Sequence, residues 1–244
     1  MIDPVASIPL YMRIYRHLQS QILNNTLQVG DKLPSERELG GIYNASRITV
    51  RQALERLLKD ELIVTVQGKG AYVRRSLLKL DLMQVSSFGA IMQERGLAAS
   101  TRLLGFEENV KVEPFIGFAG GVASRMELLG LIQGKPAVHY RAIIRRDVAQ
   151  RIVPLAREHE RHGRVFSTFS LFGEIGCRIS QVNQEIFAED ADNFLASVLD
   201  VLPGRALLKM TYLAFDAANA PLEYKVGHYR SDRYSFSVVR KNLT

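Results

Sequence analysis

Residues 33–52, LPSERELGGIYNASRITVRQ, constrain the fold of this chain more than any other stretch. Ser35 stands three residues before Glu38, which is the spacing of a capping box, and this predicts a helix that begins at Glu36. A glycine pair and an asparagine then predict a turn, and Ser46 predicts the cap of a second helix. Two helices joined by so short a turn are typical of a helix-turn-helix.

The neighbouring stretches extend this motif into a small domain. An apolar stripe at four-residue steps predicts a preceding helix over residues 10–25, formed by Leu10, Ile14, Leu18 and Ile22. The helix after Ser46 is expected to turn to the core Val50, Ala53, Leu54, Leu57 and Leu58. Two strand-like runs, Leu62–Val66 and Ala71–Arg74, flank Gln67-Gly68-Lys69-Gly70 and predict a β-hairpin. Residues 1–75 are therefore expected to form a winged helix-turn-helix.

Composition narrows the class of protein. Apolar residues make up 47% of the 244 residues and charged ones 23%, as in a globular protein with a core. No apolar run approaches the length of a membrane span, and the N-terminus does not read as a signal peptide. Cys177 is the single cysteine, which excludes an internal disulfide and suits the cytoplasm. Residues 1–75 carry 11 Lys and Arg against 7 Asp and Glu, a balance consistent with a polyanionic partner.

The rest of the chain predicts a second domain of mixed structure. Residues 76–84 are expected to be an ordered linker, and residues 85–244 a domain that alternates helices and strands. The predicted helices are Ser87–Arg95, Ala119–Leu129 and Ala188–Leu199. The predicted strands are Val138–Ile144, Arg151–Arg157, Val182–Phe187, Leu207–Phe215 and Leu222–Tyr229. This pattern favours an α+β domain around an antiparallel sheet.

Four blocks of residues 9–73 resemble the DNA-binding domain of GntR-type bacterial transcription regulators: the Pro-Tyr start, GDKLPSER, SRITVRQAL and GKGAYV. The tail 221–238, PLEYKVGHYRSDRYSFSV, resembles the end of the UTRA effector domain of the HutC branch, with Ser231 in place of the usual glycine. Residues 86–96 resemble the start of that domain. The resemblance implies a homodimer on a palindromic DNA operator, a small-molecule effector, no cofactor, and an effector fold like that of a chorismate lyase.

The candidate DNA-binding residues lie on the predicted helices and hairpin. Arginine can donate two hydrogen bonds to guanine, and hydroxyl groups at a helix start can bind phosphate. For Arg37 the resemblance implies a DNA contact, and the alternative is a solvated arginine paired with Glu38 or Glu55. The full set is Ser35, Arg37, Ser46, Arg47, Thr49, Arg51, Gly68, Lys69 and Gly70.

The candidate effector-binding residues follow from the resemblance to sugar-phosphate sensors. They are Ser87, Phe88, Gly89, Arg141, Glu158, Ser167, Glu223 and Tyr229. The alternative for each is structural: Glu158 can pair with a neighbouring arginine, and Tyr229 can be part of the core. Those relatives also carry two arginines at positions that align with Ala142 and Ile144, whereas this chain has Arg141, Arg145 and Arg146 nearby. Either the alignment slips by one residue, or the pocket suits a less anionic ligand, such as a small organic acid in place of a phosphorylated sugar.

These observations predict a cytoplasmic, ligand-responsive transcription regulator of the repressor type. The five histidines form no cluster with the spacing of metal ligands, and no nucleophile or phosphate-binding motif is present, so neither a metal site nor an enzyme is expected. Two alternatives stay open. One is a constitutive DNA-binding regulator with a degenerate pocket, and the other is an enzyme of the lyase-like fold.

Overall fold

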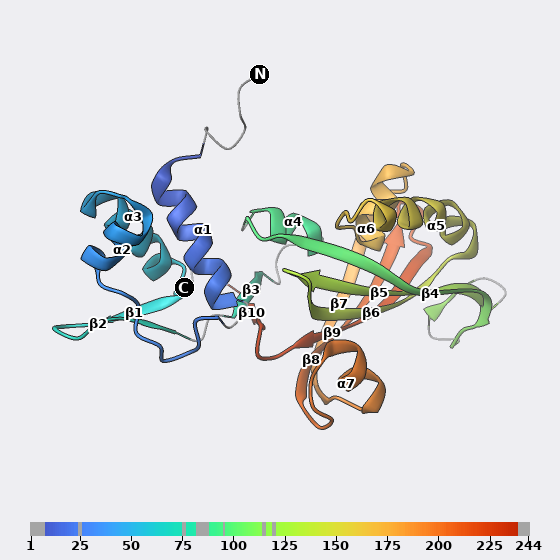
Figure 1. The fold of residues 1–244 in the computed structure, drawn as a ribbon. Helices are drawn as coiled ribbons and strands as arrows, with labels where there is room; N and C mark the ends of the chain where they lie inside the picture. Colours follow the sequence, from blue (N-terminus) through green and yellow to red (C-terminus); the bar gives the residue numbers. More distant parts are fainter. Residues whose placement is uncertain are drawn as a thin grey trace, which may run out of the picture. The chain divides into compact units, whose positions relative to one another are not determined.

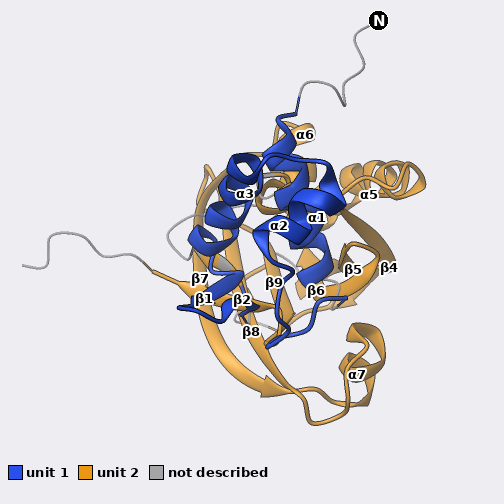
Figure 2. Cartoon of the chain, turned by 60° about the vertical axis from the view of Figure 1, so that its left-hand side comes forward, with its two compact units in different colours: residues 1–77 blue, residues 78–244 orange. Residues whose placement is uncertain are grey.

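The computed structural model describes residues 8–23, 26–74, 77–81, 88–94, 96–113, 116–118 and 121–238 (Figure 1). The chain forms two compact units, residues 1–77 and 78–244, which Figure 2 distinguishes by colour. No helix in the described ranges is long and apolar enough to span a membrane.

Unit 1 is a winged helix-turn-helix. Its helices are α1 (Leu10–Leu23), α2 (Glu36–Tyr43) and α3 (Arg47–Lys59), and its hairpin is β1 (Ile63–Val66) with β2 (Gly70–Val73). The apolar stripes that the sequence predicts meet in one core, formed by Ile14, Leu18, Ile22, Leu39, Val50, Ala53, Leu57, Leu62, Ile63 and Val73 among others. Leu54 and Leu58 pack at its edge, whereas Leu10, the first residue of the stripe predicted for α1, is exposed. The predicted architecture of this unit is therefore confirmed.

Local caps determine where α2 and α3 begin and where α2 ends. The backbone N–H of Glu38 donates to Ser35 Oγ at 3.3 Å, and the Ser35 N–H donates to the Glu38 carboxylate at 2.7 Å, so the predicted capping box is present. Ser46 Oγ likewise accepts from the N–H of Thr49 at 3.2 Å. Asn44 ends α2 with φ of 47°, the left-handed conformation that asparagine tolerates. Each serine cap typically contributes about 1 kcal/mol.

Unit 2 is built on a six-stranded antiparallel sheet in the order β4-β5-β6-β9-β8-β7. Its strands are β4 (Ala99–Lys111), β5 (Val122–Ile132), β6 (Lys135–Ile144), β7 (Ile179–Asp190), β8 (Ala206–Asp216) and β9 (Pro221–Arg230). A separate parallel pair joins β3 (Leu78–Asp81) to β10 (Tyr234–Ser237). The helices are α4 (Phe88–Glu94), α5 (Arg146–Arg161), α6 (Thr168–Glu174) and α7 (Asn193–Leu199). The α+β class of this domain is confirmed.

The helices cover opposite faces of the sheet. Helices α5 and α6 pack on Met126, Leu128, Ala142 and Ile144, whereas α7 packs on Leu129, Leu131 and Leu207. Because neighbouring residues of a strand point to opposite faces, Leu128 and Leu129 place these two cores on the two sides of the sheet. Figure 1 shows α5 and α6 on one side and α7 on the other. We call the side under α5 and α6 the α5–α6 face.

Three predicted elements of unit 2 are wrong. The helix predicted over 119–129 is strand β5, whose residues pair with β4 and β6 on both sides, although residues 119 and 120 lie outside the described part. The strand predicted over 151–157 belongs to α5, which buries Val148, Ala149, Ile152, Val153 and Ala156. The helix predicted over 188–199 begins only at Asn193, because 188–190 continue β7 and Asp192 caps α7. Strand β4 and helix α6 have no counterpart among the sequence predictions.

The stretch expected to be the linker overlaps strand β3. Leu78–Asp81 pairs in parallel with Tyr234–Ser237, close to the C-terminal end of the described chain. Residue 76 and residues 82–84 of that stretch lie outside the described part. The departure at Ser231 is accommodated locally, since its hydroxyl group donates a hydrogen bond to the carbonyl oxygen of Ala206.

Candidate functional site

The exposed face of α3 carries two arginines in its first two turns. Arg47 and Arg51 stand four residues apart and are both exposed, whereas Val50 and Leu57 are buried. Arg51 Nε donates to the Glu55 carboxylate at 3.1 Å, with both side chains more than half exposed. An exposed pair of this kind contributes little to stability and can exchange partners at low cost. Both guanidinium groups are thus available to an outside acceptor.

Arg37 lies in the first turn of α2 and is also exposed. Within the described part of the chain it forms no hydrogen bond or ion pair. Glu38 is engaged by Ser35, whose hydrogen bonds are the main reason that the pKa of Glu38 is lowered. Glu55 is engaged by Arg51. Arg37 thus makes no ion pair with either carboxylate in this structure, although its charge contributes to the lowered pKa of Glu38.

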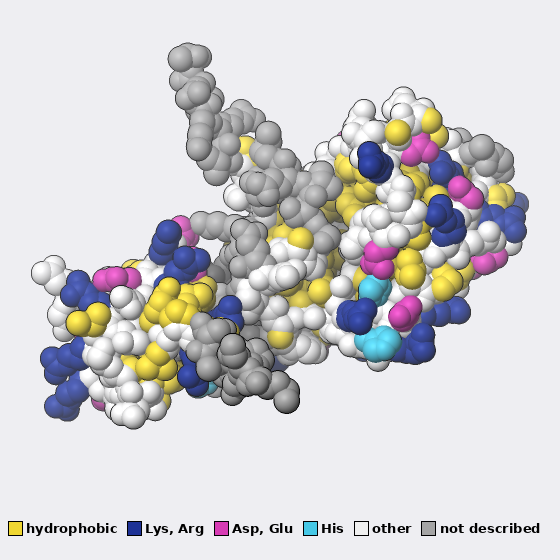
Figure 3. All heavy atoms as spheres, turned by 90° about the horizontal axis from the view of Figure 1, so that it is seen from above, with side chains coloured by type: hydrophobic (Ala, Val, Ile, Leu, Met, Phe, Trp, Pro, Cys, Tyr) yellow, Lys and Arg dark blue, Asp and Glu magenta, His cyan; other side chains and the backbone are white. Residues whose placement is uncertain are grey.

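The tip of the β1–β2 hairpin presents a lysine between two glycines. The Lys69 N–H donates to the carbonyl oxygen of Val66 at 2.9 Å and closes the turn. Gly68 and Gly70 have φ of 73° and 109°, values that favour glycine, and both are exposed. In Figure 3, Lys and Arg side chains of unit 1 gather at the left edge of the view. The hairpin tip and α3 each present exposed cations of the kind that bind a polyanion.

A buried ion pair lies on the α5–α6 face of unit 2. Glu223 and Lys225 stand two residues apart on β9 and point to the same side, with Lys225 Nζ 3.0 Å from the Glu223 carboxylate. The Glu223 side chain is fully buried and that of Lys225 is 7% exposed. Burial lowers the pKa of Lys225, and the neighbouring carboxylate opposes that shift. Sequence reasoning named Glu223 and missed Lys225, although a lysine at i+2 of a strand carboxylate shares its face.

Lys225 is held by polar and aromatic groups of α6 and β8. Its Nζ donates to Thr168 Oγ1 at 3.1 Å and lies 3.6 Å from the centre of the Phe169 ring and 5.0 Å from that of Tyr212. Cation–π contacts of this kind strengthen when water is excluded. The second carboxylate oxygen of Glu223 has no hydrogen-bond partner among the described residues. The cluster therefore retains an unused acceptor beside a buried cation.

Tyr229 joins this region through its hydroxyl group. The Tyr140 hydroxyl donates to that of Tyr229 at 3.1 Å, and the hydroxyls of Tyr212 and Tyr229 lie 2.6 Å apart. Burial raises the pKa of Tyr140 and of Tyr229 well above the ordinary value, and raises that of Tyr212 to about 12. All three are thus neutral phenols at physiological pH and act as hydrogen-bond donors and acceptors.

The other predicted effector residues are dispersed. Ser167 caps α6 and is nearly buried next to Thr168, so it adjoins the Glu223–Lys225 cluster. Phe88 is buried at the start of α4, and Gly89 lies so close to Val165 that a Cβ atom there would stand 3.0 Å from its side chain. Glu158 is exposed on α5. Ser87 lies outside the described residues.

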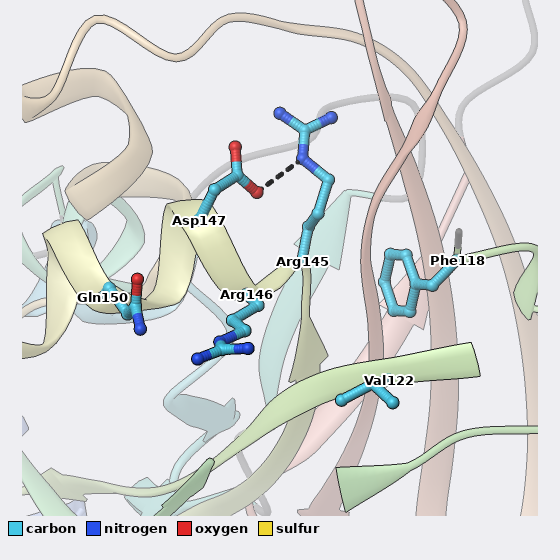
Figure 4. A pocket seen from close by; sticks show the side chains of 6 residues that line it. All are labelled: Phe118, Val122, Arg145, Arg146, Asp147 and Gln150. Carbon is cyan, nitrogen blue, oxygen red and sulfur yellow. Dashed lines mark hydrogen bonds and ion pairs between the residues drawn. The ribbon is translucent and has the colours of Figure 1, made fainter. Parts of the chain in front are cut away.

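The three arginines of the β6–α5 region do not join the Glu223–Lys225 cluster. Arg141 points to the opposite face, where it bonds to Glu127 at 2.9 Å and lies over the ring of Phe194. Arg145 precedes α5 and pairs with Asp147 and Asp216. Arg146 lines a hollow of about 400 Å³ at the start of α5, together with Phe118, Val122, Arg145, Asp147 and Gln150 (Figure 4).

The two positions that align with the paired arginines of the sugar-phosphate sensors are buried and apolar. Ala142 and Ile144 are completely buried in the core under α5 and α6. On the adjoining strand β9, Lys225 stands directly opposite Ala142, and Glu223 stands directly opposite Ile144. Side chains in such positions have Cβ atoms about 5 Å apart. A cation is thus present beside position 142, but β9 supplies it instead of β6.

Comparisons with known proteins agree with both units. Residues 10–73 match the model of the bacterial regulatory proteins of the gntR family, and residues 94–235 match that of the UTRA domain. The transcriptional repressor NagR of Bacillus subtilis is 26% identical over 236 residues, which is 96% of each chain. The transcriptional regulator Rv0792c of Mycobacterium tuberculosis is 26% identical over 246 residues, covering 96% of this chain and 86% of its own.

The fold is also that of a solved regulator. The crystal structure of PhnF from Mycobacterium smegmatis superposes with a TM-score of 0.66 at 22% identity, over 93% of this chain and 99% of that one. At this identity the likeness shows the fold alone. The two domain matches in order, which together span most of the chain, show more: the chain belongs to the GntR family of bacterial transcription regulators, in the branch that carries a UTRA domain.

Proposed function

We propose that this chain is a ligand-responsive transcriptional repressor that acts as a homodimer in the cytoplasm. Residues 1–75 bind a palindromic operator, residues 76–84 connect the two domains, and residues 85–244 bind a small metabolite and hold the dimer together. The observation that carries the proposal is the exposed pair Arg47 and Arg51 on α3, and the exposed lysine at the hairpin tip adds to it. The repressor names of relatives such as NagR support the sign of regulation.

On the DNA side, the proposal assigns roles by chemistry. Arg47 and Arg51 donate to base edges in the major groove, and Arg37 and Lys69 bind at the groove or the phosphates. The hydroxyl groups of Ser35, Ser46 and Thr49 add phosphate contacts, and Gly68 and Gly70 let the hairpin backbone approach the groove. Binding through this many cations has to weaken steeply as salt increases.

On the ligand side, we assign the effector site to the cluster around Glu223 and Lys225, next to Ser167 and Tyr229. A buried cation and an acceptor oxygen without a partner fit a small molecule that carries an anionic group and a hydroxyl or amino donor. A phosphorylated sugar and a small organic acid both have this chemistry. Because the pair is buried, a ligand that reaches it has to displace packed side chains, which couples binding to a change of the domain.

That coupling gives a mechanism of repression and release. A ligand can shift the protein between two dimer geometries only by as much as its affinities for them differ. A coupling of about 1–3 kcal/mol, or about 5- to 150-fold in operator affinity, is usual for such regulators. An enzyme of the same fold is the second candidate, and the buried Glu223–Lys225 pair is an acid–base pair on which turnover could depend.

The test begins with full-length protein and sheared DNA from the organism's own chromosome. Fragments retained by the protein are sequenced, and a retained duplex is then titrated by fluorescence anisotropy at fixed salt. Sugar phosphates, amino acids and small organic acids are added one at a time and followed for operator release and for chemical change. The proposal predicts that the retained fragments share one palindromic sequence. It also predicts that a compound releases the protein from that sequence and is itself recovered unchanged. Retention without sequence preference would contradict it, and conversion of the compound would favour the enzyme.

A further inference from the structure

Ile48, the second residue of α3, is left in solvent by the fold of unit 1. Its exposed fraction is 72%, the highest among the exposed large apolar residues described in that unit, ahead of Val29 and Ile42 at 64%. A β-branched residue is also a poorer helix former than alanine by a few tenths of a kcal/mol. Neither burial nor helix propensity therefore explains an isoleucine at this position.

The place of Ile48 on α3 is more informative than its exposure. At about 100° per residue, the buried residues Val50, Ala53 and Leu57 lie about 200°, 140° and 180° around the helix from Ile48. Ile48 is therefore at the middle of the outward face. Arg51 follows on the same face, three residues along the helix and so one turn away. Single exposed apolar residues are common, so what distinguishes Ile48 is its position beside Arg51, on the helix face proposed to meet DNA.

The chemistry of this side chain selects its partner on DNA. The first residues of a recognition helix are those that reach base edges in the major groove. Isoleucine has no donor or acceptor, so it can read neither guanine nor adenine by hydrogen bonds. The apolar group that a base presents in the major groove is the 5-methyl of thymine. We infer that Ile48 is a specificity-determining residue that packs on a thymine methyl group, an inference that rests on the DNA-binding part of the proposed function.

The same packing would discriminate against cytosine. A cytosine in that place presents its amino group in the groove, and an isoleucine packed over it leaves that donor without a partner. The neighbouring arginines are assigned to guanines at their own positions and cannot substitute for this reading. The recognition sequence is thus expected to contain a thymine beside the guanines that Arg47 and Arg51 contact.

The experiment removes the methyl group from the DNA and the side chain from the protein. A duplex is selected from a random pool by the full-length chain, and each thymine is then replaced singly by deoxyuridine, which lacks only the methyl. One thymine for each bound α3 is expected to lose about fourfold in affinity, the equivalent of one buried methyl group. With Ile48→Ala, the same replacement is expected to have no effect, and cytosine is tolerated there better than by the unaltered protein.

Leu202→Ala is the matched control, because it removes the same three carbon atoms from an 80% exposed residue of unit 2. It should keep the full sensitivity to deoxyuridine, and thermal melting should show both variants folded. If no thymine shows a methyl effect that depends on Ile48, the inference is wrong while DNA binding stands. If the chain enriches no sequence at all, the DNA-binding proposal fails and the inference fails with it.

Discussion

Replacing Lys225 with methionine should destabilise unit 2 strongly at neutral pH. Methionine keeps the straight side chain and its favourable contact with the ring of Phe169, so packing changes little. What is lost is the cation 3.0 Å from Glu223, whose side chain is fully buried. One of its oxygens already has no hydrogen-bond partner among the described residues, so nothing else there compensates its charge.

The size of the effect can be bounded. Removing one partner of a buried ion pair typically costs about 3–5 kcal/mol. A buried glutamate that has lost its cation can instead take up a proton. Because the reference pKa of a glutamate side chain is about 4.3, keeping one protonated at pH 7 costs about 3.7 kcal/mol. We therefore expect a loss of about 3–4 kcal/mol at pH 7 that shrinks toward pH 4, where protonation is nearly free. Adding Glu223→Gln to Lys225→Met should restore most of the loss, because no uncompensated charge remains.

Urea titration of the full chain, read by hydrogen–deuterium exchange of peptides from β8 and β9, follows the sheet separately from unit 1. Comparing each variant with the unaltered protein at the same pH cancels the titration of other groups. A loss below about 1 kcal/mol at pH 7 would show that Glu223 carries no charge in the folded protein. A loss that is the same at pH 4 as at pH 7 would assign the effect to packing. Either result would refute the reasoning.

The other predictions concern α3, the ligand response and a buried histidine. Arg51→Ala should weaken binding to the selected duplex by about 1–3 kcal/mol, whereas Glu55→Gln, which only frees the arginine, should not; equal gel-shift affinities would reject the α3 assignment. Glu223→Gln should leave operator affinity intact and abolish release by the effector, so loss of DNA binding in a folded variant would make this residue structural. Burial lowers the pKa of His139 to about 4, against the pull of Glu127. The neutral His139 should therefore contribute fully to the free energy of unfolding above pH 6.5, and that contribution should fall by about 3 kcal/mol toward pH 4. In thermal melts, His139→Gln should show a weaker dependence on pH over this range.

Unit 1 could be predicted from sequence because its signals are local. Ser35 and Ser46 form hydrogen bonds with backbone groups three residues away, and Asn44 takes a conformation open to few residue types. The ends of these helices can therefore be recognised from the residues beside them. Strand β5 gives no such signal. Its residues 128–132 are buried on both faces, so burial does not alternate there, and its Met, Glu and Leu residues are good helix formers. Pairing with distant strands decides its structure, and a short window cannot contain those strands.

The sequence predicts a strand where the structure has helix α5, and the reason there is different. Its buried residues follow the helical spacing from Val148 to Ala156, but a window that starts at Arg151 contains only part of that pattern. Pro154 inside the window also argues against a helix, since proline gives up one backbone hydrogen bond. In the structure Pro154 is exposed on the outer side of α5, where water can satisfy the freed carbonyl group. The full stripe of apolar residues outweighs that one local cost.

The cation of the proposed effector site shows what a linear alignment cannot see. Comparison by position asks whether residue 142 is an arginine, and alanine gives a negative answer. In the sheet, however, position 142 is adjacent to position 225, which lies 83 residues later in the chain, and Lys225 points to the same face. A charge can therefore move from β6 to β9 and remain beside the same helix, α6, through Thr168. The shift also changes the chemistry, because a lysine is a compact charge with a pKa that burial lowers, whereas an arginine offers a planar fork to a phosphate. The relatives' two arginines and this single lysine thus favour different anions, and carboxylates and phosphates should be ranked against each other in the ligand screen.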